Sequence, residues 1–191
     1  MRALGKGSIA EIIRVGLVLA WAGLWLCGAA LAAVAVAYAL NALGLVDMHA
    51  FFGAGARLQV DEVSVPAASP SWLVVAPAFL AGVVIVCGGL VIVWHLRRLF
   101  DSFCSGQPFA TQNASHLRAI WVTMVGIELA RYLLLALTGL LLAKFGAGLE
   151  QHVQIKLHLN LGTWASILIL VVLAEVFREG ARMQAEQELT I

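Results

Sequence analysis

Charged residues are scarce in this chain. Only 12% of its 191 residues are Asp, Glu, Lys or Arg, whereas 62% are hydrophobic and the mean hydropathy is +0.94. A soluble domain carries about a quarter charged residues, so a chain this apolar cannot cover its surface with polar groups. The formal net charge of +1 supplies no excess of basic residues, and we expect no direct nucleic-acid binding.

Cysteine is rare as well, and its three positions form no recognisable site. Cys27 and Cys87 lie within apolar runs, and Cys104 lies in a polar segment. Because the sequence has no Cys-x-x-Cys pair or Cys/His cluster, it indicates neither a disulfide framework nor a zinc site. It also has no Ser/His/Asp set, paired carboxylates, zinc-protease motif or phosphate-binding glycine loop. We therefore expect a non-enzymatic protein without a cofactor or metal.

Long apolar runs are what the chain does have. A helix needs about 20 residues to cross the hydrocarbon core of a bilayer. The predicted spans cover residues 12–40, 72–96, 119–142 and 161–177. The first run exceeds the roughly 7–15 apolar residues of a signal peptide, so we expect it to be retained. The last run is short, so it either borrows residues 155–159 or crosses the bilayer with little tilt. The sequence thus predicts one domain, residues 1–191, that is an all-α integral membrane fold of four helices.

Basic residues gather on one side of this layout. They flank the first span and occur in the link 97–118 and the tail 178–191: Arg2, Lys6, Arg14, Arg97, Arg98, Arg118, Arg178 and Arg182. The outer loops 41–71 and 143–160 hold only Arg57, Lys144 and Lys156. Because Lys and Arg are costly to translocate, we expect the link and both ends of the chain in the cytoplasm, an N-in/C-in topology.

Both outer loops contain the period-two alternation of strands. The stretch "RLQVDEVSVP" alternates at four apolar positions, with a slip at Asp61-Glu62: Leu58, Val60, Val63 and Val65. The stretch "HVQIKLHLN" alternates strictly. We expect one strand from each loop, paired into a small extracytoplasmic β-element, with the slip forming a bulge.

Small residues recur at a spacing of four in the first two spans. Ala29, Ala33 and Ala37 form one such row, and Ala78 and Gly82 form another. Rows of this kind let helix backbones approach closely within a membrane. The alternative is that Ala and Gly are simply common in spans.

Two opposite charges, Glu128 and Arg131, lie within the third apolar run. Their spacing places them on one helix face, with Cβ atoms about 5–6 Å apart. A charge at the centre of a span costs about 2.5–3.5 kcal/mol on insertion scales, and pairing lowers that cost. We favour a structural intramembrane ion pair; a polar relay or transport path and an unpaired arrangement are the alternatives. Against transport, the sequence shows no inverted repeat with broken helices.

The link carries signals for helix ends. The second span is expected to continue through Arg97 and Arg98 and to stop at Gly106, with Pro108 just beyond. Thr111 is suited to cap a helix that leads into the third span. Three aromatic residues are expected at headgroup level: Phe100, Phe103 and Phe109. The link is then either a helical hairpin on the membrane surface or a docking platform for a cytoplasmic partner.

The link and the tail resemble those of a known family. The link residues that carry the resemblance are Phe103, Gly106, Pro108, Phe109, Asn113, Leu117, Arg118 and Ile120. The tail residues are Phe177, Arg178, Glu179, Gly180, Gln184, Glu186 and Glu188 to Ile191. These patterns resemble the bacterial membrane-protein family called domain of unknown function 2975, and the four-span layout agrees over nearly the whole chain.

The resemblance implies a multi-pass protein of the bacterial inner membrane with no established activity. Genes of this family often lie beside one for a helix-turn-helix regulator, which implies a membrane-anchored regulatory or sensory partner of a cytoplasmic transcription regulator. The candidate docking surface comprises Arg97, Arg98, Phe103, Gly106, Pro108, Phe109, Asn113, Arg118, Arg178, Glu179, Gln184, Glu186 and Glu188. The alternative function is a small transporter or channel that uses Glu128 and Arg131. The lipid bilayer is an expected partner, and homo-oligomers are left open.

Overall fold

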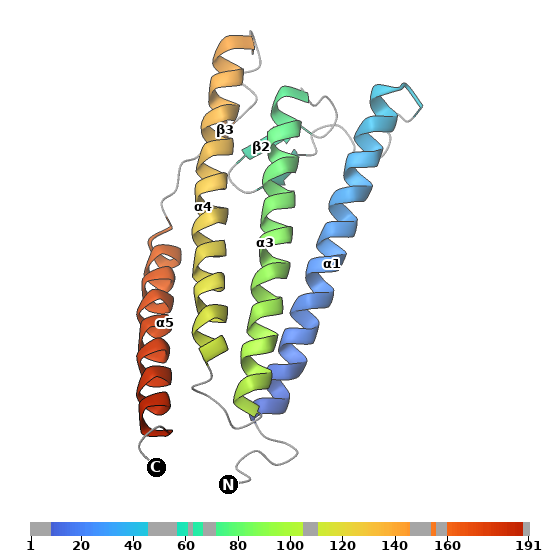
Figure 1. The fold of residues 1–191 in the computed structure, drawn as a ribbon. Coiled ribbons are helices and arrows are strands. Elements are labelled where there is room, and N and C mark those ends of the chain that lie inside the picture. Colours follow the sequence, from blue (N-terminus) through green and yellow to red (C-terminus); the bar gives the residue numbers. More distant parts are fainter. Residues whose placement is uncertain are drawn as a thin grey trace. The chain divides into compact units, whose positions relative to one another are not determined.

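The structure is a computed structural model that describes residues 9–45, 57–60, 63–66, 72–104, 111–145, 154–155 and 160–188. Its helices are α1 (Ile9–Ala42), α3 (Trp72–Cys104), α4 (Thr111–Phe145) and α5 (Leu161–Glu188) (Figure 1). Each of the four contains a segment long and apolar enough to cross a membrane. The expectation of four helices that are able to span a membrane is thereby confirmed, whereas the orientation of the spans stays a prediction.

The helix surfaces are apolar. Large apolar side chains are exposed on every helix, for example Leu26 in α1, Val83 in α3, Leu133 in α4 and Leu168 in α5. Water would disfavour such faces, whereas lipid acyl chains match them. A helix also satisfies its own backbone hydrogen bonds, as hydrocarbon surroundings require. These faces therefore fit contact with a lipid bilayer.

α1 ends in a Schellman motif. Leu45 N–H donates to the carbonyl oxygen of Leu40, and Gly44 N–H donates to that of Asn41, both at 3.0 Å. Gly44 has a φ of +71°, a left-handed conformation that glycine adopts without a Cβ clash. The local sequence thus ends this helix close to the predicted end of the first span.

The helices on both sides of the link extend past the predicted spans. α3 continues over residues 97–104, and α4 already begins at Thr111. In the part of the chain that is described, the link therefore consists of the ends of two long helices. Whether these ends lie on the membrane surface stays a prediction. The predicted stop at Gly106, with Pro108 beyond it, lies outside the described residues.

α5 begins at an asparagine cap. Asn160 Oδ1 accepts a hydrogen bond from Thr163 N–H at 3.3 Å, the N-cap arrangement. Ile155 does not extend this helix as the sequence suggested, because it belongs to strand β3 (Gln154–Ile155). The helix gains its length at the other end, where it runs to Glu188.

The chain divides into two compact units. Unit 1 comprises Met1–Leu24, Gly88–Gly126 and Asn160–Ile191. Unit 2 comprises Trp25–Cys87 and Ile127–Leu159. The helices α1, α3 and α4 are each divided between the two units, whereas α5 belongs to unit 1 alone.

In unit 2, α1 and α3 approach closely at a glycine. A Cβ atom at Gly82 would lie 3.0 Å from Leu31 Cδ2, so a larger residue would not fit without a shift. Ala78 is buried on the same helix, as expected for the row of small residues in α3. The expectation for α1 is wrong in part, because Ala29 and Ala33 are exposed.

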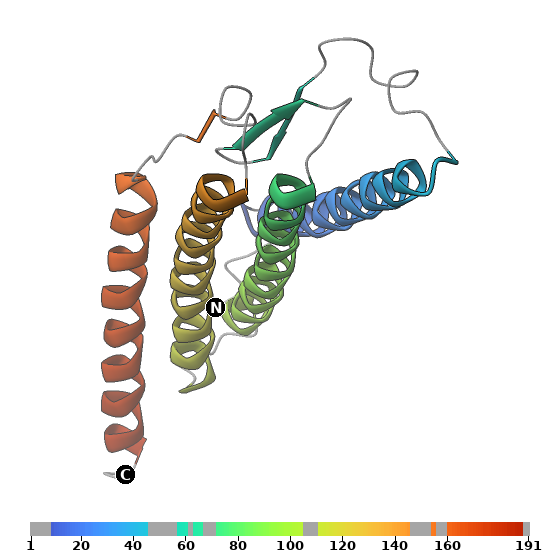
Figure 2. The ribbon, with the colours of Figure 1, turned by 90° about the horizontal axis from the view of Figure 1, so that it is seen from above.

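Unit 2 also contains three short strands, β1 (Arg57–Val60), β2 (Val63–Pro66) and β3, in the order β1-β2-β3 (Figure 2). All pairs are antiparallel: Val60 is opposite Val63, and Val63 is opposite Ile155. The chain thus reverses between Val60 and Val63, whereas the alternating sequence had favoured one bulged strand there. Asp61-Glu62, the expected bulge, lies outside the described residues. The side of the membrane on which these strands lie stays a prediction.

In unit 1, the first turns of α4 contribute three buried side chains to the core. Asn113 is fully buried, and Leu117 and Ile120 are nearly so. Their spacing of four and three residues places them on one helix face. Phe103 of α3 stacks on Phe177 of α5, with 5.7 Å between the ring centroids. This packing joins the helix ends that carry the link and the tail.

Candidate functional site

The two charges in the apolar part of α4, Glu128 and Arg131, are both in unit 2 and form an ion pair. Arg131 Nη2 lies 3.1 Å from Glu128 Oε2, and the two side chains are only 13% and 10% exposed. Glu128 Oε2 accepts no hydrogen bond of good geometry within the described residues, so the contact is mainly Coulombic. The Arg131 guanidinium also lies 5.1 Å from the centroid of the Tyr132 ring, within cation–π range.

Because both charges of this pair belong to α4, the pair does not itself tie two helices together. It neutralises the two charges where they stand, which lowers the cost of keeping each in apolar surroundings. Thr138, two turns further along α4, satisfies its hydroxyl within the helix by donating to the carbonyl oxygen of Leu134 at 2.8 Å. The ion pair and the Thr138 hydrogen bond thus both form within α4 itself.

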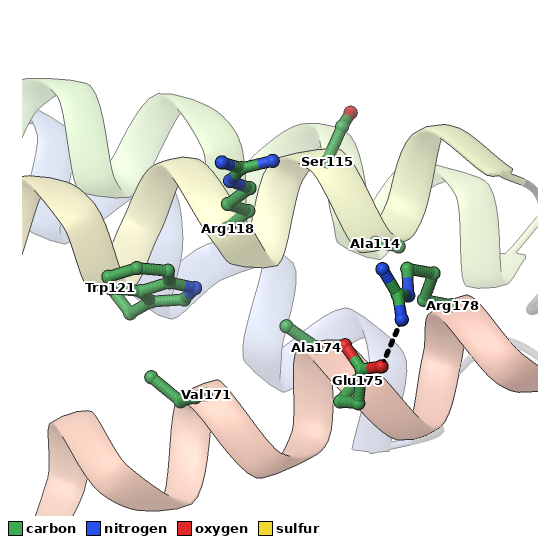
Figure 3. A pocket seen from close by; sticks show the side chains of 8 residues that line it. All are labelled: Ala114, Ser115, Arg118, Trp121, Val171, Ala174, Glu175 and Arg178. Atoms are coloured by element: carbon green, nitrogen blue, oxygen red, sulfur yellow. Dashed lines mark hydrogen bonds and ion pairs between the residues drawn. The ribbon is translucent and has the colours of Figure 1, made fainter.

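A pocket of about 500 Å³ lies in unit 1 between α4 and α5. Its lining residues are Ala114, Ser115, Arg118 and Trp121 from α4 and Val171, Ala174, Glu175 and Arg178 from α5 (Figure 3). Small alanines on both helices leave room there, and the long side chains surround it. No sequence motif predicted this pocket, because its lining residues come from two segments that are distant in the sequence.

The pocket contains two cationic groups and one anionic group. Arg178 Nη2 is paired with Glu175 Oε1, as the dashed line in Figure 3 shows. Arg118 is exposed and has no ion-pair partner within the described ranges. Ser115 Oγ donates to the carbonyl oxygen of Gln112 at 2.7 Å, which leaves its oxygen able to accept. The pocket is therefore electropositive.

A histidine pair joins α3 to α4 in unit 1. The Nδ1 atoms of His95 and His116 lie 3.0 Å apart, so one ring donates and the other accepts. The Trp94 ring meets both imidazoles at steep angles, and the Arg98 guanidinium lies 4.2 Å from its centroid. This pair could not be predicted from the sequence, because its members are 21 positions apart and form no motif. Among the described residues, no group of three His, Cys, Asp or Glu could hold a metal.

The predicted docking surface is only partly exposed in the link. Arg97, Arg98 and Arg118 are exposed, and Phe103 is half-buried in its aromatic stack. Asn113 is fully buried and belongs to the core of unit 1, so its assignment to a docking surface is wrong. Three further residues of the predicted surface lie outside the described residues: Gly106, Pro108 and Phe109.

The tail half of that surface lies on α5 and is rich in ion pairs. Arg182 Nη2 lies 2.7 Å from Glu179 Oε1, and Arg182 Nε lies 3.4 Å from Glu186 Oε1. Gln184 is exposed beside them, and Glu188 is the last residue of the helix. Each exposed pair at this spacing adds only about 0.3–0.5 kcal/mol. These pairs lie on the polar part of α5, beyond its apolar segment.

A family model matches residues 59–191, and its description is "Protein of unknown function (DUF2975)". No curated protein and no solved structure matches the chain. The match includes the link, the pocket and the tail, and it begins after α1. Because it covers well over half of the sequence, the chain belongs to the DUF2975 family of proteins of unknown function.

Proposed function

We propose that the chain is a non-enzymatic protein of the bacterial inner membrane that holds a cytoplasmic helix-turn-helix transcription regulator at the bilayer. The observation that carries this proposal is the extension of α5 beyond its apolar part as a charged helix. A polar helix this short is marginal in water by itself. Continuity with an apolar segment keeps it formed, and its mixed charges can pair with those of a protein partner.

The distribution of arginines supports a cytoplasmic position for this helix. Arg97 and Arg98 on α3, Arg118 on α4, and Arg178 and Arg182 on α5 all belong to unit 1. Such residues stay on the cytoplasmic side during insertion. We therefore assign the link and the tail to the cytoplasm and the strand-bearing loops to the opposite side, the N-in/C-in topology.

The class of partner comes from the family. Genes that resemble this one often lie beside a gene for a small helix-turn-helix regulator, and a membrane anchor can limit the access of such a regulator to DNA. The choice of partner is an analogy between gene neighbourhoods. The charged face of α5 is the surface on which binding of such a regulator can be tested.

The test is capture of the neighbouring regulator by the full chain after coexpression and detergent extraction. Arg182→Glu breaks both ion pairs and reverses an exposed charge without touching the apolar segment. We expect it to weaken capture by about tenfold, as the loss of a well-placed charge contact does. Arg182→Lys keeps the charge and should capture normally. A chain that ends after Gln184 should insert but capture poorly.

Two outcomes would contradict the proposal. One is a wild-type chain that captures no regulator. The other is capture that is equally strong with Arg182→Glu and with the shortened chain, which would show that α5 is not the docking element.

A transport path through Glu128 and Arg131 is less well supported. A proton or ion relay needs a series of ionisable or polar groups along its route. Within the described residues the buried polar side chains besides Glu128 are Asn113 and Thr138, and neither ionises. A flux assay with the chain in liposomes would distinguish this alternative.

A further inference from the structure

We propose that the pocket between α4 and α5 binds the phosphate group of an anionic phospholipid, with Arg118 and Arg178 as its cationic residues. The pocket has a volume of about 500 Å³ and lies wholly within unit 1. This proposal concerns a lipid ligand and does not depend on any protein partner.

The polarity of the pocket changes along its length. In Figure 3, Trp121 and Val171 lie toward one end, Arg178 lies toward the other, and Arg118 lies between them. A phospholipid has the same order of groups, since acyl chains follow the glycerol and the phosphate. Tryptophan also favours the boundary between headgroups and acyl chains, where its ring is buried and its N–H remains near water.

The two arginines lie where apolar sequence ends. Arg118 directly precedes the apolar run 119–142, and Arg178 directly follows the run 161–177. Both runs belong to helices that can span a membrane, so their ends reach the headgroup level. Basic pockets between spanning helices at the cytoplasmic headgroup level are suited to anionic lipids. The sequence position and the pocket thus indicate the same ligand.

Charge decides which headgroup fits. Arg118 has no ion-pair partner in the described part of the chain, and a guanidinium can donate two parallel hydrogen bonds to a phosphate. Glu175 is paired with Arg178 and opposes an anion in the same pocket. Removal of the Glu175 charge should therefore strengthen phosphate binding, whereas removal of either arginine should weaken it.

The experiment is native mass spectrometry of the purified full chain with phosphatidylglycerol and phosphatidylcholine of identical acyl chains. We expect the wild-type chain to retain phosphatidylglycerol preferentially. Arg118→Gln and Arg178→Gln should each lower that preference about fivefold, and Glu175→Gln should raise it by a similar factor. Arg182→Gln is the matched control, since Arg182 is also paired with a glutamate, is 66% exposed against 71% for Arg178, and does not line the pocket.

A gain of binding by Glu175→Gln would support the proposal strongly, because a misfolded variant would not gain a ligand. Equal retention of the two lipids by the wild-type chain would overturn it. An equal loss of preference in Arg182→Gln would also overturn it, since the attraction would then be diffuse. If millimolar inorganic phosphate displaced the lipid fully, the site would be one for free phosphate and the lipid assignment would be wrong.

Discussion

At the scale of single residues, the unusual feature is a carboxylate and a guanidinium in an apolar helix. The contact between Glu128 and Arg131 could be expected from sequence, because two residues three positions apart on a helix share a face. The structure places their charged atoms 3.1 Å apart. The contact between His95 and His116 could not be expected, because it depends on how two separate helices are aligned.

The buried pair should behave differently from an exposed pair of the same spacing. Glu128→Gln leaves Arg131 buried and uncompensated, which should lower the free energy of unfolding by about 3 kcal/mol. The double variant with Arg131→Met should recover most of that loss. Glu175→Gln is the control, because its pair with Arg178 is exposed and should cost less than about 1 kcal/mol. The measurement is unfolding of the detergent-purified chain, and additive losses in the double variant would show that Glu128 and Arg131 do not act as a pair.

At the scale of helices, packing depends on where small residues meet large ones. Gly89 faces Leu24 in α1, as Gly82 faces Leu31 in unit 2. The sequence indicated that small residues pack closely, but it did not show which side of α1 meets them. Ala29 and Ala33 were natural candidates by spacing, yet they are exposed. A row of alanines is compatible both with the face of a helix that packs against another helix and with the face that contacts lipid. Spacing alone therefore could not show which face of α1 packs against α3.

A bulkier residue at a close-contact glycine should destabilise unit 1. A Cβ atom at Gly89 would lie 2.9 Å from Leu24 Cδ2, so Gly89→Val should lower stability by about 1–3 kcal/mol. A Cβ atom at Gly126 would meet no other group of the described residues within 4 Å, so Gly126→Val should leave stability nearly unchanged. Thermal unfolding of the two variants in the same detergent gives the comparison. Equal losses would mean that valine itself, and not the contact with Leu24, causes the effect.

At the scale of the whole molecule, the sequence was most informative where one physical requirement dominates. The need for about 20 apolar residues per span predicted four helices, and each was found. The reversal between Val60 and Val63 was missed because alternation continues through a hairpin much as it does through a bulge. Asn113 was included in the docking surface because it belongs to the link pattern of the family, and that pattern does not show that helix α4 buries this side chain in the core of unit 1. The pocket depends on the approach of α4 and α5, which local sequence does not encode.

We expect four helices to cross the membrane with the link and the tail on the cytoplasmic side. The most direct measurement uses reporters whose activity depends on the compartment, fused after Leu189, within residues 104–111, near Val65 and near Gln151. The first two positions follow the basic residues of unit 1, so we expect them to report the cytoplasm, and the other two should be translocated. A translocated reporter after Leu189 would contradict the four-span account.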